Sequence, residues 1–505
     1  MSSNTEAIST DKPNPKLVLL TVSLCTMLYS ATVTVVNVTL PQLQGALSAT
    51  PDQIAWVVTL NVVGTAVMTP LSGWLTARLG KRNLILICVI GFAVTSFLCA
   101  TANSLAPMLL YRVIQGMFGA PIVPVSQAIV LATFTGRRQA SAQAFFGMAV
   151  VAGLALAPVA GGYAAELYNW RAVFLLLIPI CIAALVMTFL FIKPEDKQEE
   201  TRLDWTGFLS LAVSIACLQL LLDRGESLGW FSSTEIILYA GSLALGLYIF
   251  TVHTATAEHS FLNRELLRNR NYMVGLVIVC FYGMLNFTPV TLLPPLLQTW
   301  HGYPDSLIGW LLAMRGFGTF VGFFLAARLA RFDPRYSMAG GFALIGLSGF
   351  MLAVVEPNSR ADWIAWAGLI QGLGSGICWV PATTAAFWNV PPRLLPDGAA
   401  IFHLLRNLGQ SIYLAVAFLV IVRTGQTSYS ELTTHINPYN EALAENLRNP
   451  YPSIAFLQQL QTLGTEVSKQ ANLIAFNNAF LLYGWSCLAA IPIVFLWRKT
   501  DRVEA

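Results

Sequence analysis

Fourteen separate apolar runs, each about as long as a membrane-spanning helix, constrain this sequence more than any other feature. A helix needs about 20 apolar residues to cross about 30 Å of hydrocarbon, and a backbone in lipid must satisfy its own hydrogen bonds. The sequence therefore predicts an all-α polytopic membrane protein with fourteen spanning helices. The runs lie at approximately 17–41, 53–77, 83–102, 106–134, 140–165, 170–192, 205–222, 235–254, 272–298, 305–328, 337–355, 363–389, 398–423 and 472–497.

The composition agrees with a lipid environment. Of the 505 residues, 56% are hydrophobic and 11% are charged, whereas a soluble protein carries about 25% charged residues. A net charge of +4 without a basic stripe argues against a nucleic-acid partner. The first apolar run follows sixteen polar residues and is too long for the core of a signal peptide, so we expect it to remain as the first span.

The distribution of Lys and Arg predicts the orientation of the chain. With the N-terminus inside, twenty of the 29 Lys and Arg residues fall in cytoplasmic segments, six fall outside and three lie within spans. This excess follows the positive-inside rule. The sequence therefore predicts an inner (plasma) membrane protein with cytoplasmic N- and C-termini.

Two segments interrupt the otherwise short loops. The charge run Lys193–Asp204 is expected to be a solvated cytoplasmic linker. The polar segment 424–471 is expected to form an external loop, which is either a surface for a partner or only a cap. The predicted organisation is a cytoplasmic tail at 1–16, a six-helix bundle at 17–193, a linker with two extra helices at 194–271, a second six-helix bundle at 272–497 that includes the external loop, and a cytoplasmic tail at 498–505.

Two pairs of short motifs indicate an internal repeat. Gln115-Gly116 in span 4 matches Gln371-Gly372 in span 12, and LTARLGKRN after span 2 resembles LAARLARFD after span 10. The two offsets, 256 and 250 residues, are nearly equal. They predict two related six-helix units with two extra helices between them. Parallel halves with a binding site near the midplane are a transporter architecture.

Several local motifs resemble those of the major facilitator superfamily. They are GWLTARLGKRNLIL (Gly73–Leu86), LYRVIQG (Leu110–Gly116), GLALAPVAGG (Gly153–Gly162), NWRAVFLLLIP (Asn169–Pro179), TVVNVTLP (Thr34–Pro41) and QIAWVVTLN (Gln53–Asn61). With fourteen spans, this ordered set is similar to the drug:proton antiporter family of the EmrB/QacA type, over almost the full chain. The resemblance implies the major facilitator fold and proton-coupled export by alternating access.

Two of these motifs are expected to control conformational change. In the cytoplasmic loop, Gly73 and Gly80 permit a tight turn, and the basic residues can meet helix C-terminal carbonyls. The alternative for this loop is an orientation signal only. In span 5, a face of small residues allows close helix packing, and the resemblance implies a pivot that limits proton leak. The residues concerned are Gly73, Arg78, Gly80, Lys81, Arg82, Gly153, Pro158, Gly161 and Gly162.

The sequence departs from the family pattern at positions that matter for charge. Related sequences commonly carry an aspartate in span 1 where this chain has Thr32. The loop motif often has an acid where this chain has Ala77, and Ala157 replaces a usual glycine of the antiporter motif. The change at Thr32 removes the usual candidate for carrying the proton.

Three arginines lie in mid-span without an acid at the same depth: Arg112, Arg315 and Arg406. A charge in hydrocarbon should face protein or a watery cavity and find acceptors. Candidate acceptors are backbone carbonyls, water and the polar residues Gln115, His403, Asn37, Asn61 and Asn286. One interpretation of each arginine is a scaffold residue. The other is a positively charged cavity for anionic or carboxylate-bearing substrates, lined by aromatic residues such as Tyr282 and Trp379.

Proton coupling has several candidate carriers. His403 is a mid-span histidine, and histidine titrates near neutral pH. The alternatives are a structural role for His403, coupling through acids at the outer ends of spans (Asp52, Glu166 and Asp223), or ionisation of the substrate itself.

The predicted function is proton-coupled export of amphipathic weak acids such as drugs, fatty acids or siderophores. Competing hypotheses are an exporter of lipophilic cations, a channel, and a transport-inactive sensor or structural partner. The chain has no phosphate loop and no metalloprotease motif, so neither an ATP-driven pump nor an enzyme is expected, and no cofactor or metal is implied. The resemblance adds a periplasmic adaptor and an outer-membrane channel as expected partners, besides the small-molecule substrate, protons and the lipid bilayer.

Overall fold

The computed structural model describes residues 14–194, 203–257, 261–298, 302–330, 333–356, 359–436 and 454–498, and the regular elements in these residues are helices. Within them, fourteen helical segments are long and apolar enough to cross a membrane. The number of spans predicted from the sequence is therefore confirmed.

The helices form two compact units. Unit 1 comprises Met1–Leu203 together with Leu395–Ala400. Buried apolar side chains such as Leu28, Phe92 and Phe174 form its core. Its helices are α1 (Pro15–Ala46), α2 (Pro51–Met68), η1 (Thr69–Leu71), α3 (Ser72–Leu79), α4 (Lys81–Thr101), α5 (Leu105–Gly119), α6 (Ile122–Thr133), α7 (Arg137–Leu167) and α8 (Trp170–Phe191).

Unit 2 comprises Asp204–Leu394 and Ile401–Ala505. The two extra helices, α9 and α10, pack on each other and group with this unit. The elements are α9 (Trp205–Arg224), η2 (Trp230–Ser232), α10 (Thr234–Thr256), α11 (Arg264–Arg268), α12 (Arg270–Asn286), α13 (Thr288–Leu296), α14 (Asp305–Leu329), α15 (Pro334–Ala353), α16 (Ala361–Ala386), η4 (Pro392–Leu394), α17 (Leu395–Thr434) and α19 (Ile454–Val494). The start of α17, Leu395–Ala400, belongs to unit 1.

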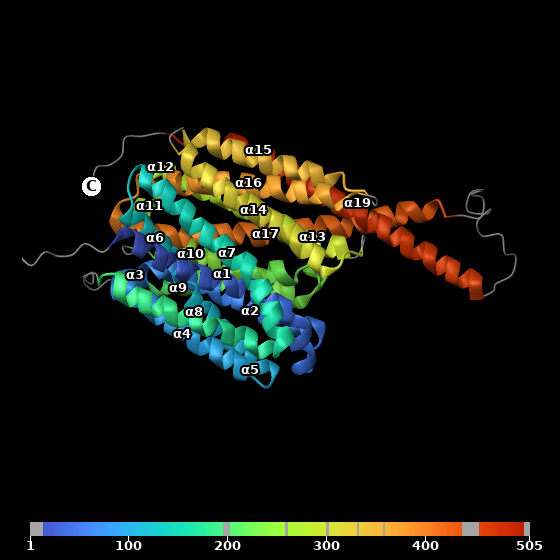
Figure 1. The fold of residues 1–505 in the computed structure, drawn as a ribbon, viewed down its shortest axis with the longest axis horizontal. Helices are drawn as coiled ribbons and strands as arrows, with labels where there is room; N and C mark the ends of the chain where they lie inside the picture. Colours follow the sequence, from blue (N-terminus) through green and yellow to red (C-terminus); the bar gives the residue numbers. More distant parts are fainter. Residues whose placement is uncertain are drawn as a thin grey trace, which may run out of the picture. The chain divides into compact units, whose positions relative to one another are not determined.

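Helix packing inside the two units is repeated. In unit 1, α2 packs on α5, and α4 packs on both α5 and α8. In unit 2, α14 packs on α16, and α15 packs on both α16 and α19, as Figure 1 shows. The matched glycines occupy equivalent contacts: Gly116 of α5 abuts the Asn61 carbonyl of α2, and Gly372 of α16 abuts the Arg315 carbonyl of α14. The packing thus supports the duplication inferred from the sequence.

In the residues that the structure describes, spans 2, 4 and 9 each contain a break beside a proline. Span 2 is divided by η1, which contains Pro70; span 4 is divided next to Pro121; and span 9 is divided between Asn286 and Thr288, next to Pro289. Proline has no N–H to donate and its ring clashes with the preceding turn. Each break therefore leaves backbone carbonyls that need other donors.

The helices that border the predicted external loop are longer than the sequence suggested. α17 continues to Thr434, and α19 already begins at Ile454, so the segment 424–471 is helical at both ends. Hydrophobicity marks only the part of a helix that lies in lipid, whereas polar helix formers extend α17 and α19 beyond it. Residues 437–453 of the loop lie outside the described residues.

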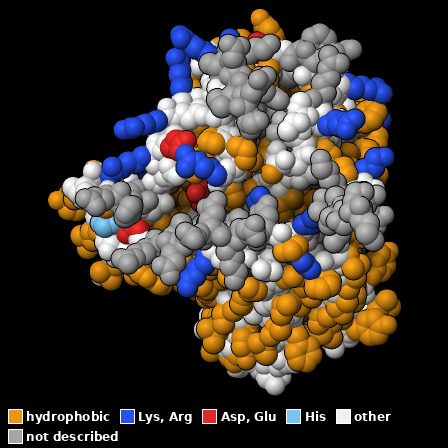
Figure 2. Space-filling view, turned by 90° about the vertical axis from the view of Figure 1, so that its left-hand side faces the viewer, with side chains coloured by type: hydrophobic (Ala, Val, Ile, Leu, Met, Phe, Trp, Pro, Cys, Tyr) orange, Lys and Arg blue, Asp and Glu red, His pale blue; other side chains and the backbone are white. Residues whose placement is uncertain are grey.

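Figure 2 views a face on which Lys and Arg side chains, in blue, outnumber the acidic groups, in red, and lie beside hydrophobic side chains. Such a face is what the positive-inside pattern predicts for cytoplasmic helix ends. The orientation of the termini remains a prediction from the sequence.

Candidate functional site

Arg112 lies inside unit 1 and is 1% exposed. Its Nε donates to the Val57 carbonyl of α2 at 3.0 Å, and its Nη1 donates to Oε1 of Gln115. Gln115 Nε2 in turn donates to Ser96 Oγ at 2.7 Å. The contact predicted between Arg112 and Gln115 is confirmed. Asn61 acts differently from the prediction, because its amide donates to the Arg112 carbonyl at 2.9 Å rather than accepting from the guanidinium.

Arg315 on α14 is held by a comparable network in unit 2, but it is only half-buried. Its Nε donates to Oε1 of Gln371 on α16. Its Nη2 donates to the carbonyl oxygen and to Oδ1 of Asn286, both at 2.8 Å. Each unit therefore uses the glutamine of its Gln-Gly pair to hold an arginine. In these bonds Arg315 donates to neutral amide oxygens, which do not neutralise its positive charge.

Arg406 on α17 lies beside an aromatic cluster of unit 2. Its Nε and Nη2 donate to Oδ1 of Asn407 at 3.3 and 3.1 Å, and its guanidinium carbon is 5.6 Å from the Trp379 ring centroid. The Trp379 ring also lies 5.2 Å from Tyr282 and 6.2 Å from His403. Arg406 is half-buried, whereas His403 is 2% exposed.

Sequence reasoning thus named residues that the structure places in two different networks. Arg112, Gln115 and Asn61 belong to unit 1, while Arg315, Asn286, His403 and Arg406 belong to unit 2. The side chain of Asn37 lies outside the described residues. Sequence reasoning missed Gln371, Ser375 and Asn407 as polar partners, although Gln371 was already marked by the repeat.

The glycines of the cytoplasmic loop motif have separate structural roles. Gly80 joins α3 to α4 with φ +77°, a conformation that favours glycine. Gly73 lies in unit 1 against the first turn of α17: a Cβ there would collide with Oδ1 of Asp397 and lie 2.9 Å from the Asp397 Cα. Gly73 therefore makes room for an acid that sequence reasoning did not single out.

The basic residues of the same loop behave in different ways. Arg82 Nη2 donates to the Phe189 carbonyl at 2.9 Å, near the end of α8, as predicted for a cation at a helix C-terminus. Arg78 is exposed, and its guanidinium lies 5.2 Å from the Trp74 ring centroid. Lys81 is half-buried at the start of α4.

Two glycines of the small-residue motif in span 5 face α1. A Cβ on Gly153 would lie 2.5 Å from a backbone oxygen of α1, and one on Gly161 would strike a valine side chain of that helix. Pro158 lies inside α7, which is assigned as one helix, and Gly162 is half-buried. Close packing of α1 and α7 therefore requires glycine at two motif positions. The pivot role remains a prediction.

Comparison with known proteins gives the family. The sequence profile of the Major Facilitator Superfamily matches residues 22–414. The chain belongs to this superfamily. It is 29% identical over 493 residues to the multidrug export protein EmrB of Escherichia coli strain K12, and 28% identical over 485 residues to the fatty acid resistance protein FarB of Neisseria gonorrhoeae. Each alignment covers 95% of both chains, so the chain is similar to these proteins over nearly its whole length.

Solved structures show the same fold at low sequence identity. The human organic anion transporter MFSD10 (TETRAN) has a TM-score of 0.61 and 14% identity, and the comparison covers 96% of this chain and 100% of that chain. The proton:xylose symporter XylE, bound to a glucose derivative, has a TM-score of 0.62 and 13% identity, with 95% of each chain covered. The predicted major facilitator fold is confirmed. Both family and fold point to a transporter.

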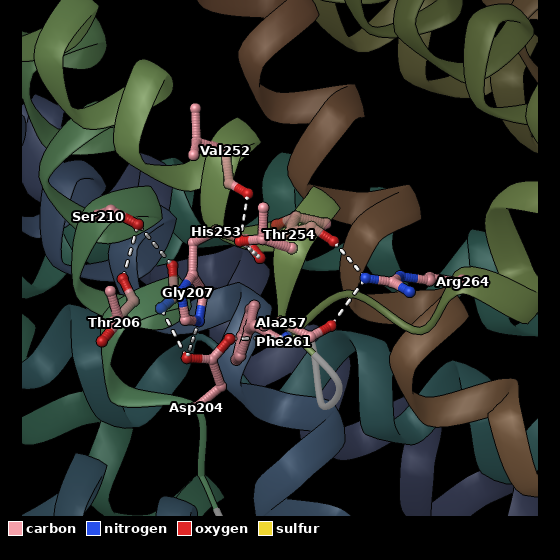
Figure 3. A network of polar contacts seen from close by, with 11 residues as sticks. Asp204, Thr206, Gly207, Ser210, Val252, His253, Thr254, Ala257, Phe261 and Arg264 are labelled. Carbon is pink, nitrogen blue, oxygen red and sulfur yellow. Dashed lines mark hydrogen bonds and ion pairs between the residues drawn. The ribbon is translucent and has the colours of Figure 1, made fainter.

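This superfamily member also has a polar network at one end of its two extra helices (Figure 3). Asp204 caps α9 through the Gly207 N–H at 2.8 Å, lies 2.8 Å from His253 Nε2 of α10 and accepts from the Phe261 N–H at 3.0 Å. Arg264 Nη2 donates to carbonyls at the end of α10. A single carboxylate thus ties α9, α10 and the following segment together. In the described residues, no three His, Cys, Asp or Glu side chains form a group suited to a metal ion.

Asp204→Asn is expected to destabilise unit 2 at neutral pH by about 1.5–3 kcal/mol, the contribution of hydrogen bonds to a charged group. Asp204 uses both carboxylate oxygens as acceptors, whereas asparagine would point its amide donors at an N–H. Burial alone raises the pKa of Asp204, but the bonds from Gly207, His253 and Phe261 outweigh burial and lower it.

The effect should depend on pH. Because the folded pKa is lowered, the contribution of the carboxylate is present above its ordinary pKa of about 4 and is lost as the pH falls through the lowered value. Thermal unfolding of the detergent-purified protein should show a gap between wild type and variant at pH 7 that closes below about pH 4. Asp362→Asn, at a side chain 68% exposed, is the matched control. An equal loss in both variants would contradict the prediction.

Proposed function

We propose that this protein is a proton-coupled exporter of amphipathic organic anions, such as weak-acid drugs, fatty acids or carboxylate siderophores, and works by alternating access in the inner membrane. The observation that carries this proposal is the pair of half-buried guanidinium groups in unit 2. Arg315 donates to neutral amides, and Arg406 donates to the neutral amide of Asn407.

The physical argument concerns charge in a medium of low dielectric constant. An arginine stays protonated in a protein, and a cavity lined by one sign of charge concentrates ligands of the opposite sign. Arginine and carboxylate also form strong, geometrically specific hydrogen bonds. The rings of Tyr282 and Trp379 pack on each other, and Trp379 lies beside Arg406. Both rings are buried in this structure, so we propose that they contact the apolar part of an amphipathic molecule once the site opens. Arg112 contributes less to this argument because it is enclosed by unit 1.

The names of two similar proteins support an anionic substrate. One relative is called a fatty acid resistance protein, and fatty acids are carboxylic acids. A structure of the same fold is titled an organic anion transporter, which supports only the compatibility of the fold with such substrates. Other relatives are called multidrug export proteins, a name that fits the competing hypothesis of cationic drugs equally well.

Reconstitution into liposomes with an imposed pH gradient tests the proposal. The panel should pair anionic and cationic dyes of similar size and hydrophobicity. We expect proton-driven transport of the anionic members at about ten times the rate of the cationic ones, a difference of about 1.4 kcal/mol in the barrier. A preference for cations would refute the anion assignment, and ligand binding without flux or counterflow would identify a transport-inactive sensor.

For proton coupling, we propose Asp397 as the carrier, with His403 as the alternative. Asp397 packs on Gly73 of the loop motif, whose usual acid is replaced by Ala77. Burying a carboxylate is costly, whereas burying the neutral acid costs far less, so protonation favours a closed contact with Gly73. His403 is 2% exposed beside the rings of Trp379 and Phe402, so a charged imidazolium there would be costly.

Asp397→Asn is expected to abolish the dependence of transport on the pH gradient while substrate counterflow continues, because asparagine resembles the neutral acid but cannot release a proton. His403→Gln is expected to retain proton-driven transport. The measurement is uptake into liposomes with and without a pH gradient, alongside counterflow at equal pH on both sides. If His403→Gln removes the gradient dependence and Asp397→Asn does not, the carrier is His403.

A periplasmic adaptor remains a prediction from the sequence. The helical ends of the external segment, α17 to Thr434 and α19 from Ile454, extend the polar surface that such a partner would use.

A further inference from the structure

At the break in span 9, side chains donate the hydrogen bonds that one backbone carbonyl accepts. α12 ends at Asn286, and Pro289 follows within one turn. The Asn286 carbonyl accepts from Arg315 Nη2 at 2.8 Å and from Gln371 Nε2 at 3.2 Å. Donors from α14 and α16 therefore cap the end of α12. All of these residues lie in unit 2.

The side-chain oxygen of Asn286 accepts hydrogen bonds from two side chains of the network. Its Oδ1 accepts from Arg315 Nη2 at 2.8 Å and from Ser375 Oγ at 2.6 Å. Ser375 Oγ is also 2.8 Å from the Tyr282 hydroxyl. A guanidinium and a hydroxyl thus converge on one amide oxygen that carries no formal charge. A carboxylate oxygen would form stronger hydrogen bonds with these two donors than a neutral amide oxygen does.

We propose that the Asn286 amide is an internal stand-in for the carboxylate of the substrate. It occupies Arg315 while the site is empty, and an anionic substrate displaces it by placing its own oxygen between Arg315 and Ser375. This inference rests on the proposed function and identifies Asn286 as a specificity-determining residue.

The selectivity follows from the exchange of one acceptor for another. A carboxylate forms a charge-assisted hydrogen bond that is roughly twice as strong as the bond from a neutral acceptor, so it displaces the amide with a net gain. A neutral ester or amide offers only an equal bond, and a cation is repelled by Arg315. The stand-in also keeps the guanidinium satisfied in the empty protein, which lowers the cost of a half-buried charge.

Two substitutions at Asn286 separate this role from a purely structural one. Asn286→Ala frees the Arg315 position, so the KM for a carboxylate-bearing dye should fall several-fold. Asn286→Asp installs a permanent carboxylate against Arg315, so transport of the same dye should fall at least tenfold. Asn103→Asp is the matched control, because it adds the same charge beside an arginine, Arg171, that lies in unit 1 outside the proposed site; its transport should equal that of the wild type. Transport in liposomes and ligand quenching of tryptophan fluorescence are the readouts.

The outcomes are distinguishable from those of the proposed function. If the wild type does not transport the anionic dye, the proposed function itself is wrong. A wild type that transports it, combined with equal losses in Asn286→Ala and Asn286→Asp, overturns the stand-in alone. If neither variant folds, wild-type transport of the carboxylate dye against its primary amide decides the matter. At least a tenfold preference for the carboxylate is expected, and equal rates overturn the inference.

Discussion

Replacement of Arg315 by alanine is expected to lower transport of carboxylate substrates by about 10- to 150-fold, because a hydrogen bond to a charged group contributes about 1.5–3 kcal/mol. The loss should appear in kcat/KM for anionic dyes and leave transport of neutral dyes largely unchanged. Arg315→Lys should recover part of the rate. Lysine keeps the charge, but its single ammonium group does not reproduce the planar fork that reaches Gln371 and Asn286 together.

Arg360→Ala is the control for loss of a positive charge, since that side chain is 84% exposed and pairs with Asp362. Its transport should equal that of the wild type. Loss of anion transport by the same factor in both variants would mean that general electrostatics, rather than the site at Arg315, attracts the substrate. Retention of full anion transport in Arg315→Ala would remove the main support for organic-acid selectivity.

Substitution of Gly372 by valine is expected to produce the largest loss of stability. A Cβ at Gly372 would strike the Arg315 carbonyl and lie 2.8 Å from the Thr319 nitrogen, so α14 and α16 would have to separate along their whole contact. Overpacking of this kind costs about 3 kcal/mol or more. The detergent-purified variant should show a lower melting temperature and a smaller monodisperse fraction than the wild type.

Gly340→Val on α15 is the matched control, because a Cβ there meets no atom within 4 Å. Gly116→Val should resemble Gly372→Val, since Gly116 makes the equivalent contact with the Asn61 carbonyl in unit 1. If Gly340→Val lost as much stability as Gly372→Val, helix propensity rather than helix contact would explain the result.

The sequence was sufficient to predict the fold because lipid imposes a simple rule on it. Each span must be helical and about 20 residues long, and the Gln-Gly pairs at Gln115 and Gln371 indicated the repeat. Contact of a side chain with a neighbour one turn away, as between Arg112 and Gln115, also follows from helical spacing.

Contacts between distant helices could not be predicted in the same way. The sequence gives Arg112 and Arg315 similar apolar surroundings, yet Arg112 is enclosed and Arg315 is half-buried. Asp397 directly precedes the predicted span 13 and was therefore expected in a loop. Its contact with Gly73 joins positions more than 300 residues apart, so it could not be predicted from the sequence. The ends of α17 and α19 were missed because polar helix beyond the bilayer carries no hydrophobic signal.

The length of α19 has a mechanical consequence. Its 41 residues make a rod about 60 Å long, roughly twice the thickness of the hydrocarbon core. When such a rod tilts by about 10° around a pivot in the bilayer, a tip about 40 Å away sweeps roughly 7 Å. If α19 tilts in this way during transport, a small rearrangement near the substrate would produce a larger displacement at the far end of the helix, and a partner bound there would move with it.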